Sequence, residues 1–372
     1  MLEQAQQGPA EEAERESSLS SREHTGNHSK LRASPNVPTS HAGGYSRCLH
    51  VVGLTDTSGY SSGVMRLFTT VLLVAACDRA HREAPAPPPP ATTPAPVASA
   101  PAEQRGCTLE PNPKVAGAKR VVAIGDIHGD LAAARAALRA AGALGTDEHW
   151  SGGELVVVQL GDVLDRGDDE TKILELFDRL EHEAHAAGGA FVPLIGNHEL
   201  MNAAHDFRYV TPGGMRDFDG ARAAELGPGG TWAKRIAHHD VIAIVGDTVF
   251  SHAGVLGDWA THVADTNLSA RCWLDGQAAE PPAVLDAQDG PVWTRALGTP
   301  GAADCAAVDR ALAALGAKRM VVAHTVQASG IDSDCDGKLW RIDVGLAKLY
   351  GGPIEVLALG AGEPKVLRGT RE

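Results

Sequence analysis

Five short polar motifs in this chain carry carboxylates, imidazoles and one amide at regular intervals. They are GDIHGD at 125–130, GDVLDRG at 161–167, GNHE at 196–199, SHAG at 251–254 and MVVAHT at 320–325. Aspartate, asparagine and histidine are hard and borderline ligands, which suit Mn, Fe or Zn better than an ion that prefers thiolates. The pattern predicts a pair of such ions, divalent or mixed-valence, and a reaction in which they activate water against a phosphate ester.

The expected ligands are the six side chains of these motifs whose donor atoms suit such ions, namely Asp126, His128, Asp162, Asn197, His252 and His324. Asp162, in the middle of the series, is expected to bridge the ions. Asp126 and His128 would complete the ligand set of one ion. Asn197, His252 and His324 would complete the ligand set of the other. Two ions about 3.5–4 Å apart can hold a bridging hydroxide, which acts as the nucleophile in an in-line displacement at phosphorus.

Each motif follows an apolar run that is typical of a buried parallel strand. The runs lie at 121–124, 155–160, 191–195, 241–245 with 249–250, and 320–323. Apolar residues at helical spacing follow the first two motifs, around 131–138 and 173–180. Alternating strands and helices predict an α/β fold, in which loops at the carboxyl ends of the strands converge on one crevice.

The order of the motifs resembles the phosphoprotein phosphatase family of metallophosphatases, whose pattern is GDxHG, GDxxDRG, GNHE and two later histidines. Finer matches resemble the Shewanella-like branch, at 161–170 (GDVLDRGDDE), 207–220 (FRYVTPGGMRDFDG), 291–295 (PVWTR) and 340–345 (WRIDVG). The resemblance covers about residues 119–359. It implies a four-layer α/β/β/α sandwich of the calcineurin-like metallophosphoesterase type. The implied activity is phosphomonoester hydrolysis, as a phosphoprotein phosphatase acting on Ser/Thr or Tyr.

The same resemblance implies catalytic roles for four residues. His198 would be the general acid that protonates the leaving oxygen, and Asp165 would orient its imidazole. Arg166 and Arg295 would form the phosphate clamp, because a planar guanidinium contacts two phosphate oxygens at once. The segment 200–234, after GNHE, is expected to form a cap of helices and loops that shapes specificity.

Two other functions are open at this stage. A dinucleoside polyphosphate hydrolase of the diadenosine tetraphosphatase type shares these motifs. A non-catalytic phosphate-binding lipoprotein would have lost ligands or His198, and all of them are present. A formal net charge of −14 makes the chain a poor partner for nucleic acid. The expected partner is a phosphoprotein or phosphopeptide, and the sequence leaves the oligomeric state unknown.

The acidic run 332–337 (DSDCDG) with Asp343 matches the calcium-loop template. Flanking helices are not expected, and 338–344 has the pattern of a strand. We interpret the run as a hairpin turn and not as a calcium site.

One catalytic domain with a long leader is the expected organisation. The expected parts are a non-native or disordered leader at 1–64, a lipoprotein signal at 65–77, a Pro/Ala-rich linker at 78–117, a catalytic domain at 118–362 and a tail at 363–372. The signal resembles those of bacterial lipoproteins, with Cys77 as the lipidated residue and the lipid as the membrane contact. This predicts the periplasmic side of a bacterial cell envelope, and the cytoplasm is the alternative.

The chain has six cysteines. If Cys48 is lost with the leader and Cys77 is lipidated, an even set remains, formed by Cys107, Cys272, Cys305 and Cys335. An exported protein would pair such cysteines in disulfides, although their spacing does not determine which pairs form. None has the spacing of a zinc site.

Overall fold

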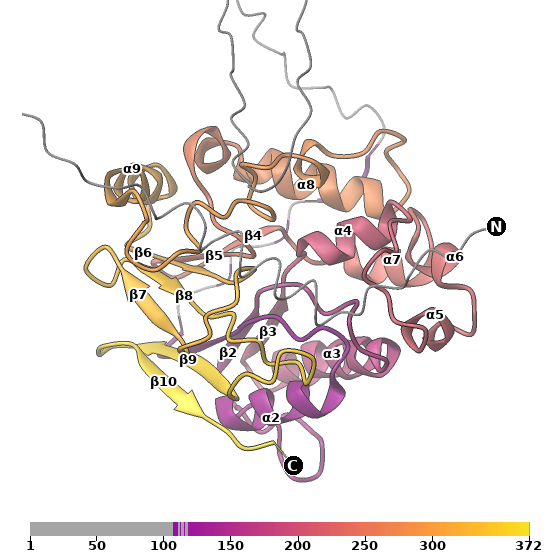
Figure 1. Cartoon of the computed structure of the whole chain (residues 1–372), viewed down its shortest axis with the longest axis horizontal. Coiled ribbons are helices and arrows are strands. Elements are labelled where there is room, and N and C mark those ends of the chain that lie inside the picture. The colour runs from indigo at the N-terminus through magenta and orange to yellow at the C-terminus, as the bar shows by residue number, and fades with distance from the viewer. Residues whose placement is uncertain (1–106, 111, 113–114, 116–117, 372) are drawn as a thin grey trace, which may run out of the picture. The chain divides into compact units, whose positions relative to one another are not determined.

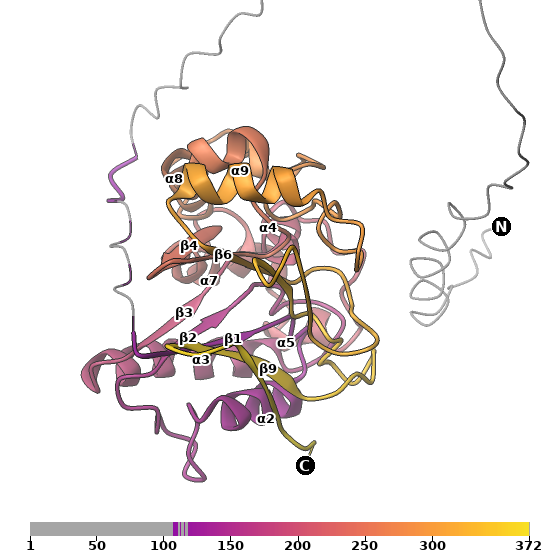
Figure 2. The same ribbon diagram turned by 90° about the vertical axis from the view of Figure 1, so that its left-hand side faces the viewer.

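The computed structural model describes residues 107–110, 112, 115 and 118–371. The expected leader and lipoprotein signal lie outside these residues, and so do most of the linker, Cys48 and Cys77. Two five-stranded sheets stack face to face, and helices cover the outer face of each sheet (Figure 1, Figure 2). This arrangement confirms the expected four-layer sandwich. Among the described helices, none is both long and apolar enough to cross a membrane.

The first sheet carries three of the five motif strands. Its order is β10-β9-β1-β2-β3, with β1 (Arg120–Ile124), β2 (Val156–Gln159), β3 (Ala190–Pro193), β9 (Glu355–Gly360) and β10 (Lys365–Arg368). The pairs β1–β2 and β2–β3 are parallel, as expected, whereas β9 and β10 are antiparallel. Helices α2 (Leu131–Ala141) and α3 (Glu170–Ala186) pack on its outer face (Figure 2).

The second sheet carries the two later histidine motifs. Its order is β4-β5-β6-β8-β7, with β4 (Ile242–Val245), β5 (Thr248–Ser251), β6 (Arg319–Val322), β7 (Asp332–Asp334) and β8 (Leu339–Arg341). Helices α8 (Val263–Leu274) and α9 (Cys305–Leu315) cover it (Figure 2). Short 3₁₀ segments lie at Gly257–Thr261 and Ala283–Leu285. The expectation of a parallel strand was wrong for 241–245, because Gly246, at φ 60°, and Asp247 turn the chain into an antiparallel β4–β5 hairpin.

Local sequence explains how the first crossover helix, α2, is bounded. Asp130 caps its start by accepting a hydrogen bond from the Ala133 amide at 2.9 Å. Gly142 ends it in the left-handed region at φ 73°. Between these ends the helix buries mostly alanines, which let it approach the sheet closely. The space between the two sheets is filled by larger side chains from both, including Val158, Leu160, Phe250, Val321 and Leu357.

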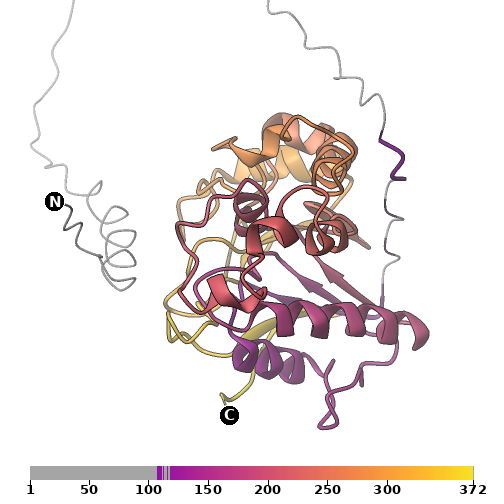
Figure 3. The ribbon, with the colours of Figure 1, turned by 90° about the vertical axis from the view of Figure 1, so that its right-hand side faces the viewer.

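The cap (residues 200–234) lies between β3 and β4, as expected. Its helices are the end of α4 (Asn197–Ala203), α5 (Gly214–Asp217), α6 (Arg222–Leu226) and most of α7 (Thr231–Ile236). They group on one side of the sandwich in Figure 1, and Figure 3 views the molecule from that side.

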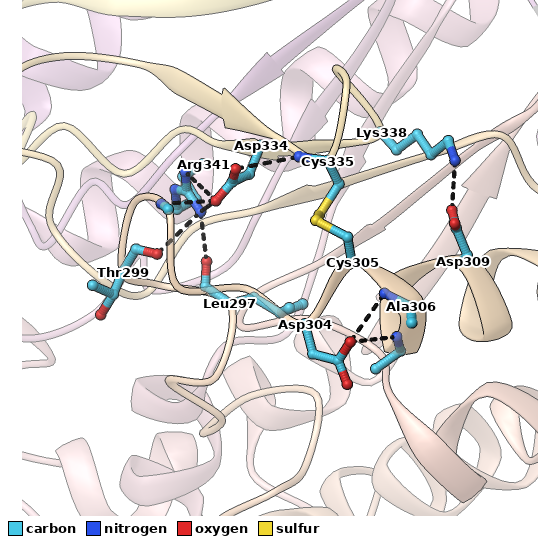
Figure 4. Close-up of a disulfide and its surroundings, with 12 residues drawn as sticks. Leu297, Thr299, Asp304, Cys305, Ala306, Asp309, Asp334, Cys335, Lys338 and Arg341 are labelled. Carbon is cyan, nitrogen blue, oxygen red and sulfur yellow. Dashed lines mark hydrogen bonds and ion pairs between the residues drawn. A yellow bond between two sulfur atoms is a disulfide. The ribbon is translucent and has the colours of Figure 1, made fainter. Parts of the chain in front are cut away.

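Two disulfides join parts of the chain that the sequence did not pair. Cys107 bonds to Cys272 on α8, and Cys305 at the start of α9 bonds to Cys335, with Cα–Cα distances of 5.8 and 5.3 Å. Cys335 lies in the turn of the β7–β8 hairpin, so the acidic run is a hairpin, as interpreted (Figure 4). Both Asp332 and Asp334 bind the buried guanidinium of Arg341.

Candidate metal centre and phosphate site

Loops at the carboxyl ends of five strands bring the six expected ligands together. Asp126 and His128 follow β1, and Asp162 follows β2. The remaining three follow β3, β5 and β6, and they are Asn197, His252 and His324. His324 is half-buried, and the other five are buried. The strands therefore converge on one crevice, although they belong to two sheets and not to one.

These loops adopt strained backbone that holds the ligands in place. His128, Asp162 and His324 have φ values of 49°, 55° and 66°, which non-glycine residues rarely adopt. Gly161 and Gly196 let two of the loops touch, because a Cβ on Gly161 would lie 2.4 Å from the Gly196 amide nitrogen. Such strain persists only where the surrounding structure enforces it, and it is common at functional sites.

Glu199 ties the same two loops together. Its carboxylate accepts hydrogen bonds from the amides of Gly196 at 2.7 Å, Asp162 at 2.9 Å and Val163 at 2.9 Å. Glu199 is the last residue of the GNHE motif but is not among the residues predicted from the sequence. It keeps the Asp162 loop in register with the Asn197 loop.

Four donor atoms crowd together around His252. Its Nδ1 donates to the Leu160 carbonyl at 2.8 Å, which leaves the lone pair of a neutral imidazole on Nε2. That Nε2 lies 2.9 Å from Asn197 Oδ1, 3.0 Å from His324 Nδ1 and 3.2 Å from Asp162 Oδ2. A single proton cannot form hydrogen bonds with all four of these atoms, whereas a metal cation lying between them can bind all four. The group therefore fits the second ion that the sequence predicts.

A second group of donors lies on the other side of Asp162. His128 donates from Nδ1 to the Leu164 carbonyl at 3.0 Å, and this directs its Nε2 into the site. The Nε2 atom lies 3.8 Å from Asp126 Oδ2 and 3.8 Å from Asp162 Oδ2. An ion about 2.0–2.2 Å from each donor fits such a space. Asp162 Oδ2 faces both groups, as a bridging ligand must.

The electrostatics of the crevice also favour bound cations. Burial raises the pKa of Asp126 well above its usual value, and the neighbouring Asp343 carboxylate raises it further. Burial likewise raises the pKa of Asp343 to about 6. Burial disfavours a charged His252, but Asp162 and Asp126 outweigh it and raise the pKa of this imidazole to about 10. Cations would offset the same carboxylate charge, so the residues present fit a two-ion site.

His198 lies beside the group that contains His128 and Asp162. Its Nδ1 lies 2.5 Å from Asp165 Oδ2, and its Nε2 lies 3.7 Å from Asp162 Oδ2. Its Nε2 is close enough for it to be a third donor with His128 and Asp162. The Asp165 contact instead matches the expected general acid, because it fixes the imidazole and leaves Nε2 directed at the crevice.

The two expected clamp arginines flank the crevice from different loops. The Arg166 backbone amide donates to the Tyr209 carbonyl at 3.1 Å. Its guanidinium lies 5.0 Å from the ring centroid of Tyr209 and 5.4 Å from that of Tyr350. Arg295 is exposed, and its Nη1 donates to Thr325 Oγ1 at 3.3 Å. Burial lowers the pKa of His324 most, the charge of His252 lowers it next, and the charge of Arg295 lowers it further. The Arg295 guanidinium therefore acts electrostatically on the site.

Arg295→Lys is expected to lower kcat/KM by about 10–100-fold, because a charge-assisted hydrogen bond contributes about 1.5–3 kcal/mol and lysine lacks the guanidinium fork. Metal content should be unchanged. Steady-state kinetics and metal analysis of the purified variant test this. Arg310→Lys is the matched control, since Arg310 is an exposed arginine on α9 with a surface ion pair to Asp304. Wild-type kinetics in Arg295→Lys would place the second clamp elsewhere.

All ten expected site residues lie at or around this crevice. The sequence analysis missed several residues that support them, namely Glu170, Glu199, Asn202, Tyr209, Arg222, Asp343 and Tyr350. Glu170, Tyr209 and Asp343 lie within the sequence runs that resemble the Shewanella-like branch, and this position could have indicated their importance. Arg222 lies two residues beyond one such run, and only its contacts reveal its importance.

The family comparison agrees with this fold and site. The sequence profile of the calcineurin-like phosphoesterases matches residues 119–328. This chain therefore belongs to the calcineurin-like phosphoesterase family.

Individual relatives define the branch. The chain is 36% identical over 281 residues to Shewanella-like protein phosphatase 2 of Arabidopsis thaliana, covering 62% of this chain and 72% of that protein. It is 29% identical over 253 residues to Shewanella-like protein phosphatase 1 of Plasmodium berghei, covering 63% and 69%. A crystal structure of a cold-active protein-tyrosine phosphatase from a Shewanella species has the same fold, with a TM-score of 0.60, 24% identity and coverage of 70% and 83%. Within the family, the chain belongs to the Shewanella-like phosphatases.

Proposed function

We propose that this chain is a metal-dependent phosphoprotein phosphatase. The observation that carries the proposal is the position of His198, held by Asp165 beside a bridging-type Asp162 and facing a crevice flanked by Arg166 and Arg295. The Shewanella-like protein phosphatases that resemble the chain support a protein substrate. Mn, Fe or Zn are the proposed ions, since the donors are carboxylate, amide and imidazole.

Each residue of the site would have a separate role in the reaction. Arg166 and Arg295 would bind and orient the phosphoryl oxygens. Two divalent ions at the ligand set would supply an activated water and neutralise phosphoryl charge. His198, as the imidazolium, would protonate the leaving oxygen from Nε2, and Asp165 would orient the ring by accepting the hydrogen bond from Nδ1–H.

Two tyrosines suggest the substrate class. Tyr209 and Tyr350 both lie near the Arg166 guanidinium, and their rings approach His198 and His128 at centroid distances of 5.2 and 5.8 Å. Aromatic rings beside the arginine and the two imidazoles can pack against an aromatic leaving group. We therefore propose phosphotyrosine as the preferred residue, ahead of phosphoserine or phosphothreonine.

A peptide panel tests the proposed function. The Mn²⁺-loaded protein is given one peptide sequence carrying phosphotyrosine, phosphothreonine or phosphoserine, together with diadenosine tetraphosphate. We expect the phosphotyrosine peptide to have the highest kcat/KM. Faster turnover of diadenosine tetraphosphate would favour the dinucleoside polyphosphate hydrolase, and no turnover of any compound would favour a non-catalytic binding protein.

We further propose that the chain acts on the periplasmic side of a bacterial cell envelope, anchored by lipid at Cys77. The lipoprotein-like run at 65–77 and the disulfides Cys107–Cys272 and Cys305–Cys335 support this location, because disulfides persist in oxidising compartments. Intact mass measurement of the native protein tests the anchor. An unmodified Cys77 within a longer soluble chain would contradict it.

Thiol titration tests the oxidising compartment separately. In protein purified from its native envelope and unfolded without reductant, we expect no reactive thiols from Cys107, Cys272, Cys305 and Cys335. The same sample after reduction is the control and should release all four. Four free thiols before reduction would indicate a cytoplasmic enzyme.

A further inference from the structure

We propose that Arg222 is a positioning residue for the general acid, holding Asp165 in the orientation that directs His198 at the leaving oxygen. This inference rests on the proposed function, because it assigns Arg222 a part in the same reaction. Arg222 begins α6 in the cap, far from the motifs in sequence.

Arg222 is a fully buried cation whose three side-chain nitrogens are all engaged. Its side chain is 1% exposed. Nη2 donates to Asp165 Oδ1 at 2.9 Å and to Glu170 Oε1 at 2.9 Å, and Nη1 donates to Glu170 Oε2. Nε donates to Asn202 Oδ1 at 2.8 Å. The guanidinium therefore joins two buried carboxylates directly behind His198.

The Asp165 carboxylate has no freedom to turn while these contacts hold. One oxygen, Oδ1, accepts from Arg222 and from Asn202 Nδ2, the latter at 2.8 Å. The other, Oδ2, lies 2.5 Å from His198 Nδ1. Without Arg222, two buried carboxylates would repel each other and Oδ1 would lose a charged donor. The carboxylate would then move, and the imidazole would lose the partner that orients it.

A guanidinium suits this position better than an ammonium. Its planar fork spans Asp165 and Glu170 at the same time, which a lysine cannot reproduce. Phe218 lies against it at 5.1 Å from the ring centroid. Another contact of the cap supports the same arrangement, since Asp217 accepts from the Thr171 amide at 2.7 Å and the Thr171 hydroxyl at 2.8 Å. The cap is thus fastened to α3 through Asp217 and to the loop that carries Asp165 through Arg222.

The test compares two substrates of similar shape, phenyl phosphate and p-nitrophenyl phosphate, in the Mn²⁺-loaded full chain. The phenolate leaves with a pKa of about 10, so it needs protonation far more than p-nitrophenolate does. Arg222→Met should lower kcat on phenyl phosphate by about 10–100-fold and on p-nitrophenyl phosphate by no more than about threefold. Arg222→Lys should recover part of the loss. Equal losses on both substrates, or none, would overturn the inference.

Arg341→Met is the matched control. Arg341 is also 1% exposed and also binds two carboxylates, but it lies in the β7–β8 hairpin and not behind His198 (Figure 4). It should change both substrates by the same factor. A second control combines Arg222→Met with His198→Asn. Because Arg222 acts through His198, the double variant should have the substrate ratio of His198→Asn alone, and a further change in that ratio would contradict the inference.

Two measurements keep the inference testable if Arg222→Met does not fold. Arg222→Met with Glu170→Gln removes one buried carboxylate together with the guanidinium, and it should show the same loss on phenyl phosphate. Proton NMR of the zinc-loaded protein should show a downfield His198 Nδ1–H signal that persists in Arg341→Met and is lost in this double variant. A retained signal with a wild-type substrate ratio would refute the role of Arg222. If the wild-type chain hydrolyses neither substrate, the proposed function is refuted. If the wild-type chain is active and only the variants behave differently from expectation, the inference about Arg222 alone is refuted.

Discussion

Asp162→Asn is expected to lose bound metal and to lower turnover by well over 100-fold, more than the roughly 10–100-fold cost of losing a supporting residue around a metal site. Asp162 Oδ2 faces His252 Nε2 at 3.2 Å and His128 Nε2 at 3.8 Å, so one substitution weakens both ion sites. Asparagine can still accept the hydrogen bond that the His198 amide makes to Oδ1 at 3.0 Å. The variant should therefore stay folded.

Metal analysis and phosphatase assays on the same sample check this result. Asp178→Asn is the matched control, because Asp178 pairs with Arg235 on the surface away from the crevice. It should keep full metal content and activity. A fully metal-loaded, active Asp162→Asn variant would show that the bridging carboxylate lies elsewhere.

His198→Asn is expected to keep its metal but to lose about 10²–10⁴-fold in turnover of phenyl phosphate, the usual contribution of a general acid. The loss on p-nitrophenyl phosphate should be much smaller, since that leaving group departs readily without a proton. The structure supports this separation, because His198 Nδ1 is held by Asp165 and its Nε2 lies beside the ligand groups.

His239→Asn provides the control for this experiment. His239 is mostly buried and lies 3.1 Å from Glu181, but it belongs to neither ligand group. Both substrates should be unaffected by its replacement. Equal losses on the two substrates in His198→Asn, or loss of metal from that variant, would indicate a ligand and not an acid.

Much of the site could be predicted from the sequence because its chemistry is carried by contiguous motifs at strand ends. Four of the five motifs combine a glycine with a polar donor after an apolar run, and the fifth places His324 directly after such a run. That local pattern predicted the ligand set and the βαβ units, and the family resemblance of the motifs implied the acid. Arg166 and the crossover helices are also local features, so they too could be predicted.

Contacts between distant residues could not be predicted in the same way. Arg222 lies 20 residues from Asn202, 52 from Glu170 and 57 from Asp165, and in sequence it cannot be told from a surface arginine. The disulfide partners are separated by 165 and 30 residues. The antiparallel β4 strand has the same apolar pattern as a parallel one.

The sequence by itself therefore predicted which residues would do the chemistry, because a metal ligand is specified by its donor atom and by the turn that presents it. Only the tertiary structure decided how those residues are held. Loops from both sheets of the sandwich bring the ligands together, and Arg222 reaches from the cap to the back of the expected acid. Burial creates these requirements, since carboxylates removed from water need partners, and those partners come from whichever segment the fold places beside them.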